Sequence, residues 1–433
     1  MTPTQQAILG IVILLVLMLL EMPVAFAMFA VGFLGLWLAA DLTVALNILG
    51  SDIWIQLGSY GMSVVPLFVF MGNIAFRTGV TTDLFESAFK WIGQFRGGLA
   101  ATTVAASTAF GAICGSNGAT TATMGTIALP IMKKYKYDDA LACGAVATGG
   151  TLGVMIPPSV VLIIVALQTN LSIAKLFIAT IPAGILLAVF MIAAVFIACA
   201  RNKNLGPAGP KTTWLEKIKS LGGVIETLML FVFVMAGMFL GWFTPTEGGA
   251  FGSAGAILIG LVRRKLKWEG FKRAVMDTIS TSTMVVMLVA GAVVLGRFLT
   301  FTRLPQTMAD WVATVDVPRF WVLMLVIVVY VVGGMLTDAL GFLTLSVPVF
   351  FPLIIAMGYD PIWFAVLVNT ITTFGAITPP VGLCLYIVKG LRPEVPIQTI
   401  FKGAVWFMPA FAVTIALLIA FPQIITGIVS SGI

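Results

Sequence analysis

The residues of this chain that could do chemistry lie in four short polar interruptions of apolar sequence. Two of them, at 113–119 and 335–341, are rich in Gly, Ser, Asn, Thr and Asp; the others, at 148–159 and 370–383, combine Thr and Gly with a Pro-Pro pair. Where such a break lies away from water, free backbone amides attract an anion and free carbonyls attract a hard cation such as Na⁺. The pattern predicts a site for a small anion and Na⁺.

The side chains of these interruptions offer hydroxyl, amide and carboxylate groups but no positive charge. An anion would therefore depend on backbone amides, hydroxyls and bound Na⁺. The candidate substrate contacts are Ser116, Asn117, Thr151, Thr337, Asp338 and Thr373. For any single Thr the alternative is a hydrogen bond back to its own helix. For Asp338 two interpretations stay open, as a cation ligand or as the N-cap of the following helix.

The composition places these interruptions in a membrane protein. Of the 433 residues, 60% are hydrophobic and 9% are charged, with a mean hydropathy of +1.10, whereas a soluble domain carries about 25% charged residues. A cytosolic enzyme and a nucleic-acid-binding protein are thereby excluded. At about 20 residues per crossing, the length allows roughly a dozen spans. We predict an all-α polytopic membrane protein.

The sequence contains no histidine, so imidazole catalysis and imidazole metal ligands are excluded. An intramembrane enzyme acting on lipid would need a clustered nucleophile and base, paired acids or a metal site, and the apolar stretches show none of these. We therefore predict that the protein is not an enzyme. Cys114, Cys143, Cys199 and Cys384 lack CxxC spacing and are expected to pack in the interior.

Positive charge is concentrated at 133–136, 201–219, 263–273 and 389–402. Such clusters mark cytoplasmic loops, and the number of crossings between them places both termini on the outer side. Residues 1–20 lack the basic n-region and the small-residue cleavage site of a signal peptide and are expected to contain a retained first helix.

Hydrophobic periodicity predicts the elements that position the four interruptions. Spans are expected at 7–20, 23–40 and 53–76, with an acidic loop at 41–52 and an amphipathic interfacial helix at 81–95. Two stretches, 97–112 and 120–132, are short for a crossing and have basic residues at both outer ends, which indicates a re-entrant hairpin with its tip at 113–119. The span that begins at 138 should be broken by its Gly and Pro-Pro residues. A linker at 201–221 precedes spans at 224–242 and 250–262.

The second half of the chain aligns on the first without gaps after a shift of 222 residues. Pro157-Pro158 then meets Pro379-Pro380, Gly153 meets Gly375, and Gly111 meets Gly333. The second copy therefore has its own hairpin at 320–355 and its own broken helix at 370–383. Because the ends of the two hairpins fall on opposite sides, we predict inverted-topology repeats. An ordinary bundle whose Gly and Pro only adjust packing is the alternative.

The repeat divides the chain into scaffold, arm and core segments. Scaffold helices are expected at 1–80 and 223–300, an amphipathic arm at 81–96 and an arm on the outer side at 301–317. The core comprises 97–170 and 318–392, each with a hairpin and a broken helix. Residues 171–222 form a connecting helix and basic linker, and 393–433 form a C-terminal helix.

Four motifs, at 110–118, 149–159, 243–247 and 376–382, resemble the large membrane subunit of tripartite ATP-independent periplasmic (TRAP) transporters, the DctM-like family. The resemblance implies an elevator-type secondary transporter of the ion-transporter superfamily in the bacterial inner membrane, with periplasmic termini. It implies Na⁺-driven uptake of a small organic acid such as a C4-dicarboxylate or sialic acid. It also implies two partners, a periplasmic substrate-binding protein (P type) and a small four-helix membrane subunit (Q type).

The resemblance further implies two Na⁺ sites, each between a hairpin tip and a broken helix. The first matches Cys114, Gly115, Ser116, Asn117, Gly153, Ile156 and Pro158, and the second matches Gly334, Gly375, Thr378 and Val381. A stand-alone Na⁺/dicarboxylate or citrate symporter of the same superfamily, which needs no binding protein, is the alternative within the transporter class.

Overall fold

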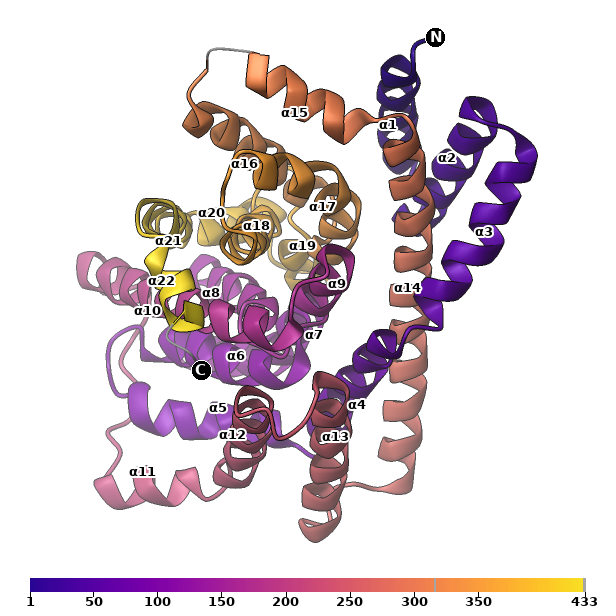
Figure 1. The fold of residues 1–433 in the computed structure, drawn as a ribbon. Coiled ribbons are helices and arrows are strands. Elements are labelled where there is room, and N and C mark those ends of the chain that lie inside the picture. Colours follow the sequence, from indigo (N-terminus) through magenta and orange to yellow (C-terminus); the bar gives the residue numbers. More distant parts are fainter. Residues whose placement is uncertain (315–316, 431–433) are drawn as a thin grey trace.

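The structure, a computed structural model, describes residues 1–314 and 317–430, and these residues form helices and no strand (Figure 1). The helices of the first half are α1 (Pro3–Leu19), α2 (Val24–Ala39), α3 (Leu42–Leu57), α4 (Val64–Arg77), α5 (Val80–Ile92), α6 (Gly98–Cys114), α7 (Asn117–Lys134), α8 (Asp139–Thr151), α9 (Val160–Thr169), α10 (Ile173–Arg201) and α11 (Trp214–Leu221). Short 3-10 turns lie at Tyr60–Ser63 and Leu152–Val154.

The helices of the second half are α12 (Ile225–Phe239), α13 (Pro245–Val262), α14 (Trp268–Phe301), α15 (Leu304–Thr314), α16 (Arg319–Leu336), α17 (Ala339–Ala356), α18 (Pro361–Gly375), α19 (Leu383–Leu391), α20 (Ile397–Val405), α21 (Met408–Ala420) and α22 (Gln423–Ser430). The predicted all-α fold is therefore correct for the described residues.

One group of helices, α1 to α4 and α12 to α14, occupies the right and lower parts of Figure 1, and we call it the scaffold. The 34-residue helix α14 packs along α2, α3 and α4, and α13 packs against α4 and α12. The crossing of α2 and α14 requires a glycine, because a Cβ at Gly32 would lie 2.6 Å from the backbone nitrogen of Leu295. The scaffold helices are thus held together along their length.

The remaining long helices form a second group on the left of Figure 1, which we call the core. In it, α8 packs against α6, α7 and α20, while α18 packs against α16, α17, α10 and α21. Residues 140–151 of α8 and 363–373 of α18 are buried. The two broken helices therefore lie inside the core, with a hairpin packed against each.

Two short helices join the scaffold to the core. The first, α5, follows α4 and packs against α6, and the second, α15, follows α14 and packs against α17. These are the segments expected as arms at 81–96 and 301–317, of which residues 315–316 lie outside the described residues.

The start of α5 is held by a cluster of charged side chains around Arg263. The guanidinium donates to Asp83 of α5 (2.7 Å), to Glu226 of α12 (2.5 Å) and to the carbonyl of Gly223 (2.8 Å). Lys265 also pairs with Asp83 at 3.0 Å. The Arg263 side chain is 12% exposed and that of Asp83 is 21% exposed, so water could replace this ion pair only in part, whereas Glu226 is 46% exposed.

The bounds of the helices recur at the offset of 222 residues found in the sequence. Helix α6 ends at Cys114 and α7 begins at Asn117. At the equivalent positions, α16 ends at Leu336 and α17 begins at Ala339. Helices α8 and α18 begin at Asp139 and Pro361, the same distance apart. The two halves therefore repeat each hairpin and each broken helix in the same order along the chain.

Two segments differ from the prediction. The expected span at 53–76 and loop at 41–52 are wrong: α3 covers most of that loop because the carboxylate of Asp41 caps it, accepting from the Val44 amide at 2.8 Å. Helix α3 then ends at Leu57, with Gly58 as its C-cap, and α4 follows the turn at Tyr60–Ser63. The counterpart of α3 and α4 in the second half is the single helix α14.

The C-terminal segment 393–433, expected as one helix, contains α20, α21 and α22. A bend of 41° separates α20 from α21, whereas their counterpart α10 runs unbroken for 29 residues. Residues 431–433 lie outside the described residues. The linker expected at 201–221 likewise contains a helix, α11, whose N-cap Thr213 and Glu216 form a capping box.

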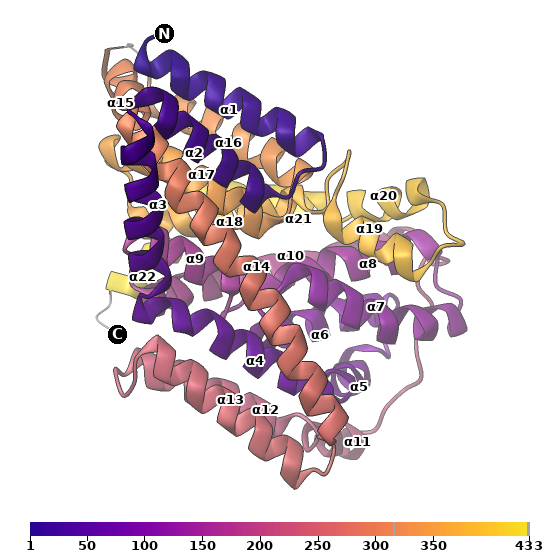
Figure 2. The same cartoon turned by 90° about the vertical axis from the view of Figure 1, so that its right-hand side faces the viewer.

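Five described helices are long and apolar enough to cross a membrane, or seven if the bent pairs α11–α12 and α20–α21 each count as one span. The chain is a multi-pass membrane protein. Figure 2 shows both chain ends and α15 at the left, and α11 with the α19–α20 connection at the right. The basic segments therefore gather at the end of the molecule that lies away from the termini.

Replacing Arg263 by Gln should lower the free energy of unfolding by about 1–3 kcal/mol, because Asp83 and Glu226 lose a partly buried partner. The measurement is the thermal unfolding midpoint in detergent. Arg264→Gln is the matched control, since this exposed neighbour makes no ion pair among residues 1–314 and 317–430. Equal midpoints for the two variants would contradict the assigned role.

Candidate functional site

The first hairpin tip is two residues long. Helix α6 ends at Cys114, Gly115 adopts a left-handed conformation (φ +65°), and Ser116 caps α7 by accepting from the Ala119 amide at 3.5 Å. The left-handed residue allows the chain to reverse at low cost because glycine has no Cβ. The tip therefore presents the last carbonyls of α6 beside the first amides of α7.

This tip touches the break between α8 and α9 through main-chain atoms. A Cβ at Gly153 would lie 2.5 Å from both the Ser116 carbonyl oxygen and the Thr120 hydroxyl, and a Cβ at Gly115 would lie 2.7 Å from the Pro158 carbonyl oxygen. The structure thus brings together Cys114, Gly115, Ser116, Gly153 and Pro158 of the first expected cation site. The Ile156 side chain points instead at Gly184 of α10.

Asn117, the first residue of α7, is 2% exposed, and its side-chain amide nitrogen and oxygen have no hydrogen-bond partner. Leaving a buried amide unpaired costs about 1–3 kcal/mol. Among residues 1–314 and 317–430 no group of three His, Cys, Asp or Glu side chains could hold a metal ion. The polar atoms at this tip are therefore carbonyl, hydroxyl and amide groups.

The second tip meets the second break in a similar way. A Cβ at Gly375 would lie 2.6 Å from Cα of Gly334, and a Cβ at Gly334 would lie 2.8 Å from the Thr372 carbonyl oxygen. Beyond the break, the amide of Gly382 donates to the Met335 carbonyl at 3.5 Å. The structure thus brings Gly334 and Gly375 together. Thr378 and Val381 lie on the adjoining loop, where the Val381 side chain is 39% exposed.

The hydroxyls of the three candidate threonines donate back into their own helices, whereas the buried hydroxyl of Thr120 has no hydrogen-bond partner within the described residues. Thr151 donates to the Thr148 carbonyl and Thr373 to the Thr370 carbonyl, both at 2.6 Å. Thr337 donates to the Gly333 carbonyl at 3.0 Å. These hydrogen bonds use the hydroxyl protons and leave the oxygen lone pairs free to accept a hydrogen bond or bind a cation.

Asp338 caps α17, and its carboxylate accepts from the Leu340 amide at 3.2 Å. The structure therefore shows the capping interpretation of this residue. Ser116 and Asp338 occupy equivalent N-cap positions, one at each tip. Direct contact of either residue with a substrate stays a prediction.

The sequence analysis missed Asn369, which joins the two halves of the core. Its side-chain amide on α18 donates to the Val154 carbonyl in the first break at 3.1 Å, and the residue is fully buried. Its side-chain oxygen has no partner. The sequence offers one indication of this role, because Asn369 is the only amide side chain in α18, whose other residues are mostly apolar or threonine.

At the basic end of the core, ion pairs also link the halves. Arg392 pairs with Asp139 at 2.9 Å and with Glu394 at 2.6 Å, and Lys133 lies 3.5 Å from Glu394. A backbone amide and the Arg392 guanidinium hold the pKa of Glu394 below its usual value. The two halves of the core are therefore joined at the breaks and again at this end.

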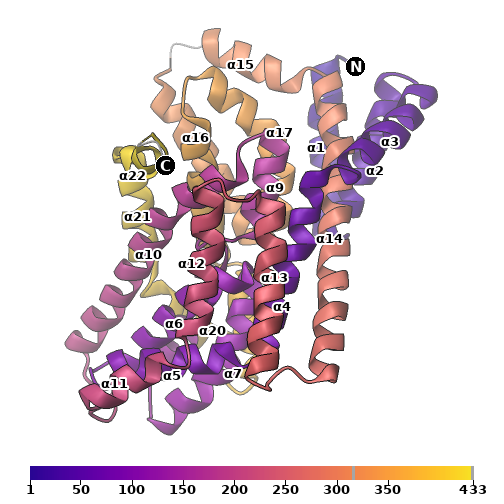
Figure 3. The same ribbon diagram turned by 60° about the horizontal axis from the view of Figure 1, so that its bottom comes forward.

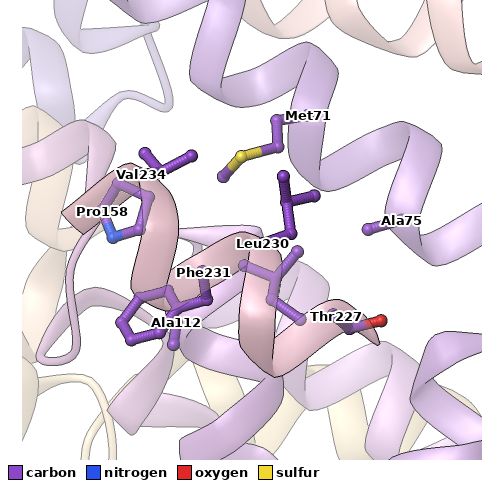
Figure 4. A pocket seen from close by; sticks show the side chains of 9 residues that line it. Met71, Ala75, Ala112, Pro158, Thr227, Leu230, Phe231 and Val234 are labelled. Carbon is purple, nitrogen blue, oxygen red and sulfur yellow. The ribbon is translucent and has the colours of Figure 1, made fainter. Parts of the chain in front are cut away.

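Near the first tip, the core faces the scaffold across side chains that are apolar except for Thr227. A crevice of about 20 Å³ separates Met71 of α4 and Leu230 and Phe231 of α12 from Ala112 and Pro158 next to the first tip (Figure 4). Closer to the tip, a Cβ at Gly72 of α4 would lie 3.2 Å from Cα of Cys114. The first tip is thus packed against the scaffold without a hydrogen-bonded side-chain contact in this crevice.

Apolar helices that enclose two polar tip–break contacts define a class, that of polytopic membrane proteins with a polar interior. The fold is similar to that of the YdaH transporter of Alcanivorax borkumensis, with a TM-score of 0.61, 14% identity, and coverage of 88% of this chain and 90% of that chain. It is also similar to MtrF of Neisseria gonorrhoeae, with a TM-score of 0.58, 14% identity, and coverage of 88% and 85%. At these identities the likeness shows the fold alone.

The family follows from the sequence. Residues 11–424 match the family model of the tripartite ATP-independent periplasmic transporter, DctM component. The chain belongs to this family of TRAP transporter large permeases, and it is a transporter subunit rather than an enzyme.

Three relatives show the range of the family. The chain is 31% identical to the C4-dicarboxylate TRAP transporter large permease protein DctM of Pseudomonas aeruginosa, over 81% of this chain and 82% of that protein. It is 30% identical to the sialic acid large permease protein SiaM of Vibrio cholerae, over 92% and 94%. It is 28% identical to the ectoine/5-hydroxyectoine large permease protein UehC of Ruegeria pomeroyi, over 95% and 96%.

Gly153→Ala should separate the first tip from its break, because the added methyl group would lie 2.5 Å from Ser116 and Thr120. We expect overpacking to lower the free energy of unfolding by about 1–3 kcal/mol. If NaCl raises the unfolding midpoint of the wild-type protein more than KCl does, this difference should disappear in the variant. Gly390→Ala is the control, since no atom lies within 4 Å of that Cβ. An unchanged Na⁺ response in Gly153→Ala would argue against a cation at this contact.

Proposed function

We propose that this permease takes up a small organic acid anion by Na⁺-coupled secondary transport. The observation that carries the proposal is the contact of each hairpin tip with a broken helix through main-chain atoms, at Gly153 and at Gly375. Such contacts bring the end of one helix against the end of another, and the last carbonyls of a helix lack partners within it. Oxygen donors of this kind suit a hard cation of single charge.

The anion would bind where helix N-termini converge. Helices α7, α9, α17 and α19 each begin at a tip or just after a break, and their first amides carry the positive end of the helix dipole. Asn117 adds a buried amide that has no partner within the described residues. Since none of the four polar interruptions contains Lys or Arg, bound Na⁺ would supply the balancing charge.

The substrate class comes from the relatives. Their names specify C4-dicarboxylates, sialic acid and ectoine, each of which carries at least one carboxylate. We propose a carboxylate of this size, received from a periplasmic binding protein, with a small four-helix membrane subunit bound to the scaffold. The proposed location is the bacterial inner membrane, with both termini in the periplasm and the basic segments in the cytoplasm.

The movement that we propose is an elevator motion of the core against the scaffold. The apolar crevice in Figure 4 supports this, because apolar side chains can slide without breaking directional bonds. The helices α5 and α15 connect the two parts and would act as its arms. The hydrogen bond of Asn369 and the ion pair of Arg392, which join the two halves of the core, would keep the core rigid as it moves.

Uptake of a labelled C4-dicarboxylate or sialic acid into proteoliposomes that also hold the small subunit should depend on an inward Na⁺ gradient and on added binding protein. Replacing Na⁺ by K⁺ should reduce uptake to the level of empty vesicles, because no Na⁺ gradient is then available to drive transport. Gradient-independent uptake would overturn the coupling. Uptake without binding protein would favour the stand-alone symporter.

Ala112→Cys combined with Phe231→Cys, in a chain whose four native cysteines are replaced, places one thiol on the core and one on the scaffold across the same crevice. A bifunctional thiol cross-linker should then arrest uptake completely, because the core can no longer move. The matched control is Lys133→Cys with Glu394→Cys, which joins two core residues whose native side chains lie 3.5 Å apart at the basic end, and its cross-linking should leave uptake intact. Full uptake after efficient cross-linking of the two thiols across the crevice would exclude the elevator motion.

A further inference from the structure

A groove lies on the outside of the core, and none of its lining residues belongs to either tip. It has a volume of about 790 Å³ and lies between α10 on one side and α20 and α21 on the other, with the start of α8 at its end. Figure 3 shows α10 along the outer edge of the molecule, beside α21 and α22. The groove therefore opens toward the surroundings rather than toward the candidate functional site.

Positive charge is confined to one end of this groove. Arg201 is the last residue of α10, and Lys402 lies on α20 just before the bend to α21, so both belong to the basic end of the molecule. No ion pair among residues 1–314 and 317–430 includes either side chain. Two cations thus face one groove without an anionic partner.

The one carboxylate that lines the groove does not neutralise them. Asp138 caps α8 and accepts from the amides of Ala140 and Leu141 at 3.0 and 3.1 Å. Its charge is therefore directed at a helix N-terminus, where it is stabilised. The charged end of the groove remains suited to an anion.

Away from the cations, both walls are apolar. On α10 the lining continues through Ala198 and Ile197 to Ala194, about 10 Å along the helix from Arg201. On the other wall it continues from Lys402 through Val405 to Trp406 and Pro409. Tryptophan is enriched at the level where the polar headgroups of a membrane meet its hydrocarbon. The groove thus changes from cationic to apolar along its length. This complements a phospholipid, which has an anionic phosphate at one end and apolar acyl chains at the other.

We propose that this groove binds an anionic phospholipid, with its phosphate between Arg201 and Lys402 and one acyl chain along Ala194 and Pro409. A soluble anion would use the cationic end but would leave the apolar walls without a partner. A zwitterionic lipid would fill the walls but would match the two unpaired cations less well. Because every lining residue belongs to the core or to its adjoining loop, the lipid would travel with the core.

The test reconstitutes the intact permease in vesicles of equal parts phosphatidylglycerol and phosphatidylcholine, extracts it mildly and measures retained lipid by native mass spectrometry. The wild-type protein should retain phosphatidylglycerol in preference to phosphatidylcholine. Arg201→Gln with Lys402→Gln should lower that retention roughly 10- to 30-fold, the effect expected for two basic residues at a lipid surface. This measurement does not depend on transport, so it can fail while Na⁺ coupling holds.

Lys203→Gln with Lys211→Gln is the matched control, because it removes the same charge from exposed linker residues outside the groove. It should retain phosphatidylglycerol as the wild type does. Ala198→Phe keeps both cations and fills the apolar wall, and it should also reduce retention. Equal loss in the control pair, no preference for phosphatidylglycerol, or complete displacement by inorganic phosphate or free dicarboxylate would each overturn the proposal.

Discussion

The structure depends on the need to satisfy backbone polar groups where no water is available. A helix that stops inside apolar surroundings leaves amides and carbonyls without partners, and each costs several kcal/mol. In this chain, helices end inside apolar surroundings at two hairpin tips and at two breaks, and each tip packs directly on a break. The glycines at 153 and 375 make this possible, because any side chain there would separate the two main chains. The functional site is thus built mainly from main-chain atoms.

The remaining architecture serves to hold those contacts and to let them move together. Asn369 and Arg392 tie the two halves of the core to each other, with hydrogen bonds at the break and ion pairs at the basic end. The face toward the scaffold is apolar instead, and the charged cluster around Arg263 holds the start of α5 on the scaffold side. Directional bonds are therefore concentrated within the two parts, and the contact around the first tip has few of them.

Much of this was predictable from local signals. The tips at 115–116 and 337–338 fall inside the predicted interruptions, because Gly, Ser and Asp end or cap helices wherever they occur. The separation of α3 from α4 was missed, since hydropathy gives no boundary between residues 53 and 76 and the Asp41 cap was interpreted as part of an acidic loop. The three C-terminal helices were missed for the same reason, because apolar residues continue across the bend near Trp406.

By itself, the sequence determined that the chain lies in a membrane, that it repeats, and where its helices must break. These follow from composition and from local backbone chemistry, which act over a few residues. The resemblance already implied that each tip faces its own break, but which residues meet there was settled only by the packing of whole helices. A Cβ at Gly111 would lie 2.8 Å from Cα of Gly153, whereas in the second half Gly334, and not the aligned Gly333, meets Gly375. Gly333 faces the ring of Phe342. The bond from Asn369 to Val154 spans 215 residues, and contacts at such separations are set by how whole helices pack.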